Sequence, residues 1–161
     1  MKHTMNPGRS GGGSKATVGI ALLGIAPLLL GGCGGGGGTE TTTAAPARKL
    51  TISMGEFYFK PANAVAGAGR VTIAAPNRGA VAHELVLART DLPASKLPTL
   101  PNGEVNEEKF EKSGHAPGEI ADVKPGESKT GTFDLPSGRY VMYCNLPGHY
   151  KAGMYGTIVV K

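Results

Sequence analysis

The residues with the greatest potential for chemistry lie near the carboxyl end of the chain. Cys144, His149 and Met154 follow one another at intervals of five residues. Pro147 and Gly153 lie among them, so the segment is not a regular helix and is expected to be a loop. A thiol, an imidazole and a thioether that converge from one loop are potential ligands of a metal ion. The segment therefore predicts a metal site.

A second histidine, from a separate predicted strand, completes the set of ligands. Two imidazoles, one thiolate and one weak thioether form the combination that favours copper. Structural zinc needs four firm donors and catalytic zinc an open position for water, and methionine suits neither. Glu84 could take the place of methionine as a zinc ligand, but Glu84 and His83 are neighbours on a strand and point to opposite faces. We expect one copper ion, with four ligands: His83, Cys144, His149 and Met154.

The first 32 residues have the layout of an export signal. Residues 1–15 are basic, and the apolar run over residues 16–30 is shorter than the roughly 20 residues that span a bilayer. The run ends in Leu-Gly-Gly-Cys, which resembles a bacterial lipobox, whose cysteine becomes the lipid-modified first residue of the mature protein. We expect a signal peptide over residues 1–32 and lipid attachment at Cys33, with a transmembrane anchor as the alternative. The expected location is extracytoplasmic, on the outer face or periplasmic side of a bacterial cell membrane.

Residues 33–48 are expected to be the lipid-attachment cysteine and a flexible linker, because they contain glycine, threonine and alanine and almost no large apolar side chain. The formal net charge of +5 falls once the signal is removed. Lys2, Arg9 and Lys15 precede Cys33, and without them 14 of the 17 basic residues remain against 12 acidic ones. No basic stripe with interleaved aromatic residues is left, so nucleic-acid binding is not expected.

From residue 49 onward, apolar and polar residues alternate with period two, which indicates short strands. Glycine and proline turns separate them, and seven or eight such strands predict an all-β, Greek-key antiparallel β-sandwich over residues 49–161. The exception is a long insertion over residues 90–117, in which residues 104–112 are expected to form a short helix. An insertion of this length is a candidate for partner-specific contacts. The strands are expected at residues 50–54, 56–59, 71–74, 82–87, 119–123, 128–134, 139–144 and 155–160.

Cys144 is the one cysteine that remains after lipidation of Cys33, so no disulfide can form within the chain. A single free thiol in an oxidising compartment needs protection from oxidation. Coordination of a metal ion provides it.

Two segments of the chain resemble a known family. Residues 144–156 read Cys-Asn-Leu-Pro-Gly-His-Tyr-Lys-Ala-Gly-Met-Tyr-Gly, and residues 81–86 read Val-Ala-His-Glu-Leu-Val. In a β-rich chain these are similar to the blue copper proteins, or cupredoxins. The two intervals of four residues between ligands resemble the rusticyanin, sulfocyanin and auracyanin branch. The resemblance implies a type 1 copper site, with His83, Cys144 and His149 in the plane and Met154 axial.

The resemblance also implies roles for the neighbours of these ligands. Tyr140 matches the tyrosine corner of Greek-key sandwiches, and by strand parity it shares the inward face with Met142 and Cys144. Tyr143 points to the other face and is expected at the surface, as part of an electron route or as a plain aromatic residue. The outer edge of His149 is expected near the surface, within a largely apolar rim of Leu146, Pro147, Tyr150 and Ala152.

The chain departs from the plastocyanin and azurin pattern directly after the first histidine. Those proteins usually have asparagine there, which ties the two ligand loops together, whereas this chain has Glu84, and asparagine follows the cysteine instead, as Asn145. We expect the Glu84 carboxylate to accept a hydrogen bond in the Cys144–His149 loop, with Asn145 as a candidate donor.

The predicted function is that of a membrane-tethered one-electron carrier, whose copper cycles between copper(II) and copper(I). The expected partners are redox proteins at the membrane, the membrane itself through Cys33, and no second copy of the chain. Copper binding or delivery without a redox cycle is the alternative. An enzyme with Cys144 as nucleophile and His149 or His83 as base would leave Met154 unexplained, so no enzymatic activity is expected.

Overall fold

The computed structural model describes residues 46–161. The predicted signal peptide, the predicted lipid-attachment residue Cys33 and nearly all of the predicted linker lie outside the described residues. Within residues 46–161, no helix is long and apolar enough to cross a membrane.

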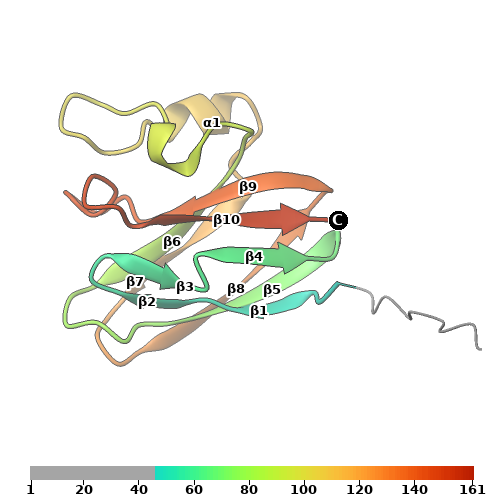
Figure 1. The fold of residues 1–161 in the computed structure, drawn as a ribbon, viewed down its shortest axis with the longest axis horizontal. Helices are drawn as coiled ribbons and strands as arrows, with labels where there is room; N and C mark the ends of the chain where they lie inside the picture. The colour runs from blue at the N-terminus through green and yellow to red at the C-terminus, as the bar shows by residue number, and fades with distance from the viewer. Residues whose placement is uncertain (1–45) are drawn as a thin grey trace, which may run out of the picture. The chain divides into compact units, whose positions relative to one another are not determined.

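The described residues form short strands, one α-helix and one 3-10 turn (Figure 1). One sheet has the strand order β1-β5-β8, a second has the order β4-β10-β9-β6-β7, and β2 and β3 form a separate hairpin. The strands are β1 (Lys49–Thr51), β2 (Ser53–Gly55), β3 (Tyr58–Lys60), β4 (Asn63–Ala66), β5 (Gly69–Pro76), β6 (His83–Arg89), β7 (Gly118–Val123), β8 (Ser128–Leu135), β9 (Gly138–Tyr143) and β10 (Tyr155–Val160).

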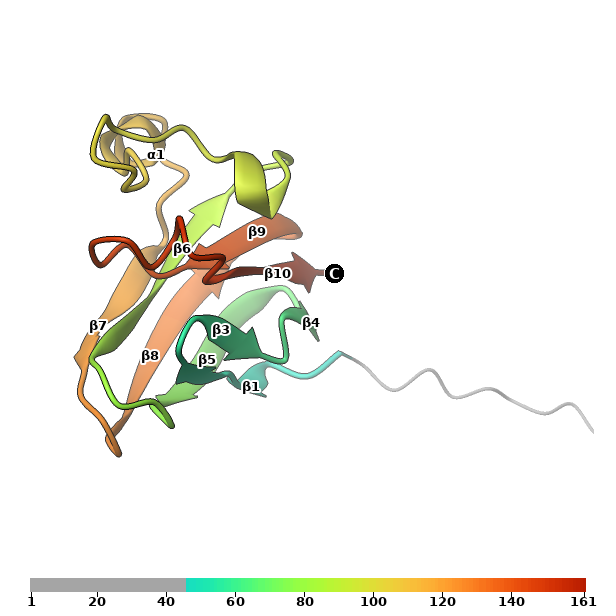
Figure 2. The same cartoon turned by 60° about the vertical axis from the view of Figure 1, so that its left-hand side comes forward.

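The core lies between the sheets, where alternate residues of their strands meet (Figure 2). Apolar side chains such as Ile73 on β5, Leu85 on β6 and Ile158 on β10 are fully buried there. Most strand pairs are antiparallel, but β1 pairs parallel with β5 and β4 pairs parallel with β10. The predicted all-β sandwich with a single short helix is confirmed.

The structure differs from the predicted strands in the region before β5. The strand predicted over residues 50–54 is divided between β1 and β2, and that predicted over residues 56–59 is a turn at Glu56 and Phe57 followed by the first residues of β3, which pairs back onto β2. Strand β4 was not predicted, since it has only four residues and two of them are alanine. Its pairing with β10, about a hundred residues later in the chain, supplies the stability that its own sequence does not.

The insertion between β6 and β7 packs against the outer face of the five-stranded sheet. It contains the 3-10 turn η1 (Ala94–Lys96) and the helix α1 (Glu108–Lys112), which is shorter than predicted. Phe110 of α1 turns inward as expected, and with Val105 it covers Val141 and Tyr143 of β9. A second apolar core therefore lies outside the sandwich.

Strand β9 has the inward and outward faces that its sequence predicted. Tyr140, Met142 and Cys144 lie in the core between the sheets, and Tyr143 lies in the second core. The Tyr140 hydroxyl donates a hydrogen bond of 2.8 Å to the carbonyl oxygen of Pro136, four residues upstream. This is the geometry of a tyrosine corner, and it pins the turn between β8 and β9.

Replacing Tyr140 by phenylalanine is expected to lower the free energy of unfolding by about 1–2 kcal/mol, because the carbonyl oxygen of Pro136 loses its partner. Urea denaturation would measure the change. Tyr58→Phe is the control, since Tyr58 is 43% exposed and its loss of a hydroxyl should cost at most about 0.5 kcal/mol. Equal effects of the two substitutions would contradict a structural role of the Tyr140 hydroxyl.

Candidate metal centre

The predicted metal ligands come together at one end of the sandwich. His83 is the first residue of β6, Cys144 directly follows β9, and Met154 directly precedes β10. Because β6 and β10 both run antiparallel to β9, the two strands begin where β9 ends. This is the left-hand end in Figure 1, opposite the carboxyl terminus.

Three donor atoms lie within contact distance of one another. The Nδ1 atoms of His83 and His149 are 3.3 Å apart, and the Cys144 Sγ atom is 3.2 Å from His149 Nδ1. One ligand atom from each of the three residues lies within 4.8 Å of those of the other two. His83 and Cys144 are fully buried, while His149 keeps one part of its ring exposed. Two imidazoles and one thiol in this arrangement fit a trigonal copper site.

Burial sets the protonation of these groups. Desolvation, and then the proximity of His149, lower the pKa of His83 below its ordinary value, and burial lowers the pKa of His149. Both imidazoles are thus neutral at pH 7, the form that binds metal. Burial raises the pKa of the Cys144 thiol to about 11, so binding of a metal ion has to displace its proton.

Met154 closes the loop that holds the other ligands. Its backbone N–H donates to the carbonyl oxygen of His149, and its carbonyl oxygen accepts from the backbone N–H of Cys144, both at 3.1 Å. The side chain is fully buried in the core between the sheets, next to these residues. A thioether in this position suits a weak axial ligand.

The hydrogen bond expected from Glu84 is present. The Glu84 Oε1 atom accepts the backbone N–H of Asn145 at 2.8 Å. The donor is the backbone, because the Asn145 side chain faces the insertion. Burial raises the pKa of Glu84, and the Asn145 N–H opposes part of that rise. The residue after the first histidine thus contacts the residue after the cysteine.

The insertion holds the ligand loop at two points. The Asn145 side chain accepts the backbone N–H of Val105 at 2.6 Å and donates to the Val105 carbonyl oxygen and to Glu107 Oε1. The Tyr150 hydroxyl accepts the backbone N–H of Leu97 at 2.9 Å and donates to the Ala94 carbonyl oxygen at 2.8 Å. Residues next to Cys144 and His149 are therefore fixed by a segment that contributes no ligand.

A buried asparagine shapes the loop that leads to His83. The Asn77 side-chain amide donates to the carbonyl oxygens of Val81 and Val123, at 2.7 and 2.8 Å, and its carbonyl oxygen accepts from Gly79. Asn77 is completely buried, so these bonds replace those that water would make. No pattern in the sequence predicts this role of Asn77.

The hairpin turn between β2 and β3 contributes two further contacts that sequence reasoning missed. The Glu56 Oε1 atom lies 3.6 Å from His83 Nε2, and the Phe57 ring packs edge-on against His149, with centroids 4.9 Å apart. The backbone N–H groups of Val81 and Ala80, which donate to the Glu56 carboxylate, lower its pKa. The only signal in the sequence for these contacts is the residue types themselves, an acidic side chain at Glu56 and an aromatic one at Phe57.

Two neighbours of the ligands lie elsewhere than expected. Tyr143 was expected at the surface but is 1% exposed, because the insertion covers it, and Tyr150 was expected in the rim but is buried. Leu146 packs partly against the core, whereas Pro147 and Ala152 are exposed as expected. Phe57, which is 42% exposed, takes the place of Tyr150 beside His149.

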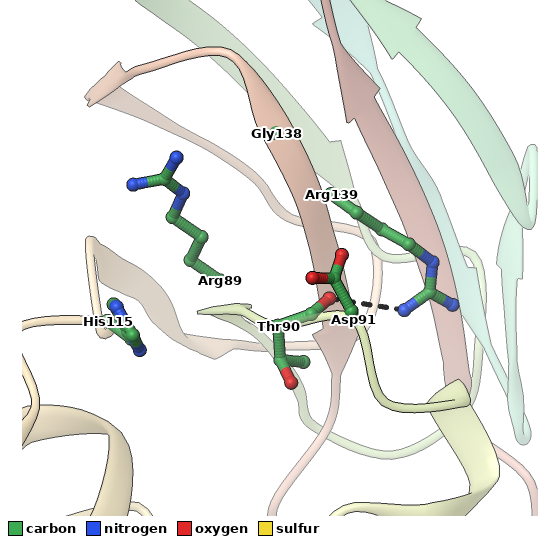
Figure 3. A pocket seen from close by; sticks show the side chains of 6 residues that line it. All are labelled: Arg89, Thr90, Asp91, His115, Gly138 and Arg139. Atoms are coloured by element: carbon green, nitrogen blue, oxygen red, sulfur yellow. Dashed lines mark hydrogen bonds between the residues drawn. The ribbon is translucent and has the colours of Figure 1, made fainter.

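A cavity of about 460 Å³ at the other end of the sandwich has no comparable chemistry (Figure 3). Arg89 and Arg139 line it, but their guanidinium groups point in different directions and donate to backbone carbonyl oxygens, those of Ser137 and of Thr90 respectively. The Asp91 carboxylate lies between them. His115, which is exposed, lies at its edge.

Replacing Asn145 by alanine is expected to loosen the ligand loop, because three hydrogen bonds to the insertion are lost. The free energy of unfolding should fall by about 1–3 kcal/mol, and a chelator should remove bound copper faster. Thermal denaturation and stopped-flow transfer to the chelator would measure these changes.

Asn102→Ala is the matched control, since Asn102 is an exposed asparagine of the same insertion whose side chain accepts only the backbone N–H of Glu104. Equal copper release from the two variants would contradict a role of the insertion in holding the loop.

Comparison with known proteins agrees with this geometry. Residues 46–161 match the model of copper binding proteins of the plastocyanin/azurin family. No curated protein matches the chain.

Several solved structures share the fold. The dithionite-reduced auracyanin of the photosynthetic bacterium Roseiflexus castenholzii is 22% identical, with a TM-score of 0.57 over 73% of this chain and 99% of its own. Auracyanin B is 26% identical, with a TM-score of 0.53 over 73% of this chain and 91% of its own. Auracyanin A, a "blue" copper protein of Chloroflexus aurantiacus, is 23% identical, with a TM-score of 0.51 over 70% of this chain and 99% of its own.

The donor set, the sandwich that positions it and the family match agree with one another. Together they assign one type 1 copper ion to the site at the end of the sandwich. The chain belongs to the plastocyanin/azurin family of copper-binding proteins and is a cupredoxin.

Proposed function

We propose that this protein is a lipid-tethered one-electron carrier, whose copper ion would be held by His83, Cys144, His149 and Met154. The observation that carries the proposal is the convergence of the buried His83 imidazole, the buried Cys144 thiol and the half-buried His149 imidazole. A bound copper ion would supply a couple between copper(II) and copper(I).

The residues around the ligands support fast electron transfer because they resist rearrangement. Asn77 fixes the loop before His83, Glu84 links that strand to Asn145, and Tyr150 is held by the insertion. Ligands held in one arrangement change little between two oxidation states, so little energy is spent on reorganisation at each transfer. The same rigidity disfavours release of the ion to another protein.

The exposed edge of His149 is the proposed point of electron exchange. Phe57, which packs edge-on against His149, is exposed, and so are Val81 and Pro147, each two residues from a proposed histidine ligand in the sequence. A small apolar contact suits brief docking of a redox protein at the membrane. A second route through Tyr143, next to Cys144, would have to leave through the insertion that covers it.

The copper-loaded protein is expected to show an intense visible absorption band from charge transfer between thiolate and copper. Cys144→Ser should abolish this band, because a hydroxyl group does not replace the thiolate. The matched control is Met142→Leu, a buried change on β9, two residues before Cys144, that removes no proposed ligand. A colourless wild-type protein that prefers zinc would refute the proposed site.

Cyclic voltammetry would separate the carrier from the alternative of copper delivery. A carrier should be reduced and reoxidised repeatedly with no loss of copper. Loss of the ion on reduction, with its capture by an acceptor protein, would favour delivery.

The tether rests on the sequence of residues 1–33, with its basic start, short apolar run and Leu-Gly-Gly-Cys ending. Cys33→Ser is expected to move the protein from the membrane fraction to the soluble extracytoplasmic fraction, because the acyl chains provide the attachment. Ala47→Ser is the control in the same linker. A Cys33→Ser protein that stays in the membrane fraction would instead favour a transmembrane anchor.

A further inference from the structure

The outer nitrogen of His83 stands out among the buried polar atoms. His83 is completely buried, its Nδ1 atom faces His149, and its Nε2 atom has no hydrogen-bond partner. It is the one buried side-chain nitrogen or oxygen within residues 46–161 that lacks one. A histidine that binds metal through one ring nitrogen normally donates from the other, which fixes the orientation of the ring.

The nearest acidic group to this nitrogen is the Glu56 carboxylate, whose Oε1 atom lies 3.6 Å away. Glu56 reaches this position from the turn of the β2–β3 hairpin, 27 positions before His83 in the chain. The distance is slightly longer than a hydrogen bond, and such contacts shorten in many sites when the site is occupied.

The carboxylate is held in place independently of His83. Oε1 accepts the backbone N–H groups of Ala80 and Val81, at 2.5 and 3.0 Å. Gly79 lies directly against the carboxylate, and a Cβ atom at that position would overlap it. The loop before His83 is thus shaped around the Glu56 side chain.

We propose that Glu56 is the positioning residue of His83: its carboxylate accepts the Nε2 proton, keeps Nδ1 directed at the copper and places a negative charge behind the ligand. This inference rests on the proposed electron carrier and extends it, because it concerns how readily that carrier is reduced. The charge favours copper(II), which carries one more positive charge than copper(I). Glu56 should therefore lower the reduction potential of the site.

Glu56→Gln isolates the charge from the shape. The amide oxygen of glutamine can still accept the backbone N–H groups of Ala80 and Val81, but the negative charge beside His83 Nε2 is gone. The equilibrium constant for reduction of the copper site should rise about three- to tenfold. Voltammetry would show this as a rise in the reduction potential, in which a tenfold change corresponds to ~59 mV for one electron.

Glu127→Gln is the matched control. Glu127 is an exposed glutamate whose carboxylate also accepts a backbone N–H, that of Lys124, in the turn between β7 and β8 at the copper end. Its substitution by glutamine removes the same negative charge from a residue that does not contact a proposed copper ligand. The potential of Glu127→Gln should change much less than that of Glu56→Gln, while the visible spectra of both variants keep the wild-type band.

A second measurement needs no variant. In the copper(I) form of the full protein, nitrogen-15 NMR of the histidine side chains should show His83 protonated at Nε2, with its proton protected from exchange with water. An Nε2 proton that exchanges as fast as that of the exposed His115, or equal potentials of the two glutamine variants, would overturn the role of Glu56. The wild-type voltammogram tests the proposed carrier separately. A reversible wave would support the carrier even if Glu56→Gln left the reduction potential unchanged.

Discussion

The constraint on which the rest of the structure depends is that three desolvated donor atoms lie within 4.8 Å of one another. Burial of the His83 imidazole and the Cys144 thiol costs free energy, and their contacts with His149 Nδ1 offset part of that cost. A bound metal ion would offset more of it, provided that the surrounding backbone keeps the donors from moving apart. Strands β6 and β9 position His83 and Cys144 at their ends. His149 lies in the loop between β9 and β10, so that loop needs other contacts to hold it in place.

That support comes from polar side chains that reach across loops. Asn77 joins the loop before His83 to the end of β7, and Glu84 joins β6 to Asn145. Each makes hydrogen bonds to backbone groups, so each fixes a path of the chain rather than a single side chain. Apolar packing alone would fill the same space, but it is not directional and would not set the orientation of the histidine rings.

The insertion belongs to this support. It forms a second core over Tyr143 and makes hydrogen bonds to Asn145 and Tyr150. The partner contacts expected of a segment this long stay a prediction. The ligand loop is therefore held from the core side by Met154 and from the outer side by the insertion. The exposed edge of His149 lies between these contacts, which leaves a small opening in an otherwise closed site.

The sequence by itself determined the sandwich, the copper chemistry and the four ligand candidates. The reason is that strand periodicity and the spacing of Cys144, His149 and Met154 are local properties of the chain, and the choice of copper follows from residue types alone. Even the contact between Glu84 and the cysteine loop was predictable, because each group adjoins a ligand.

Only the tertiary structure decided the positions of Tyr143, Tyr150, Asn77 and Glu56. Whether Tyr143 is exposed depends on where the insertion lies, and nothing within residues 90–117 encodes which sheet face they cover. Glu56 meets His83 because the β2–β3 hairpin turns at Glu56 and Phe57 and brings residue 56 beside the loop over residues 77–82. Such contacts join segments whose separation is set by the whole fold, so no local pattern in the sequence records them.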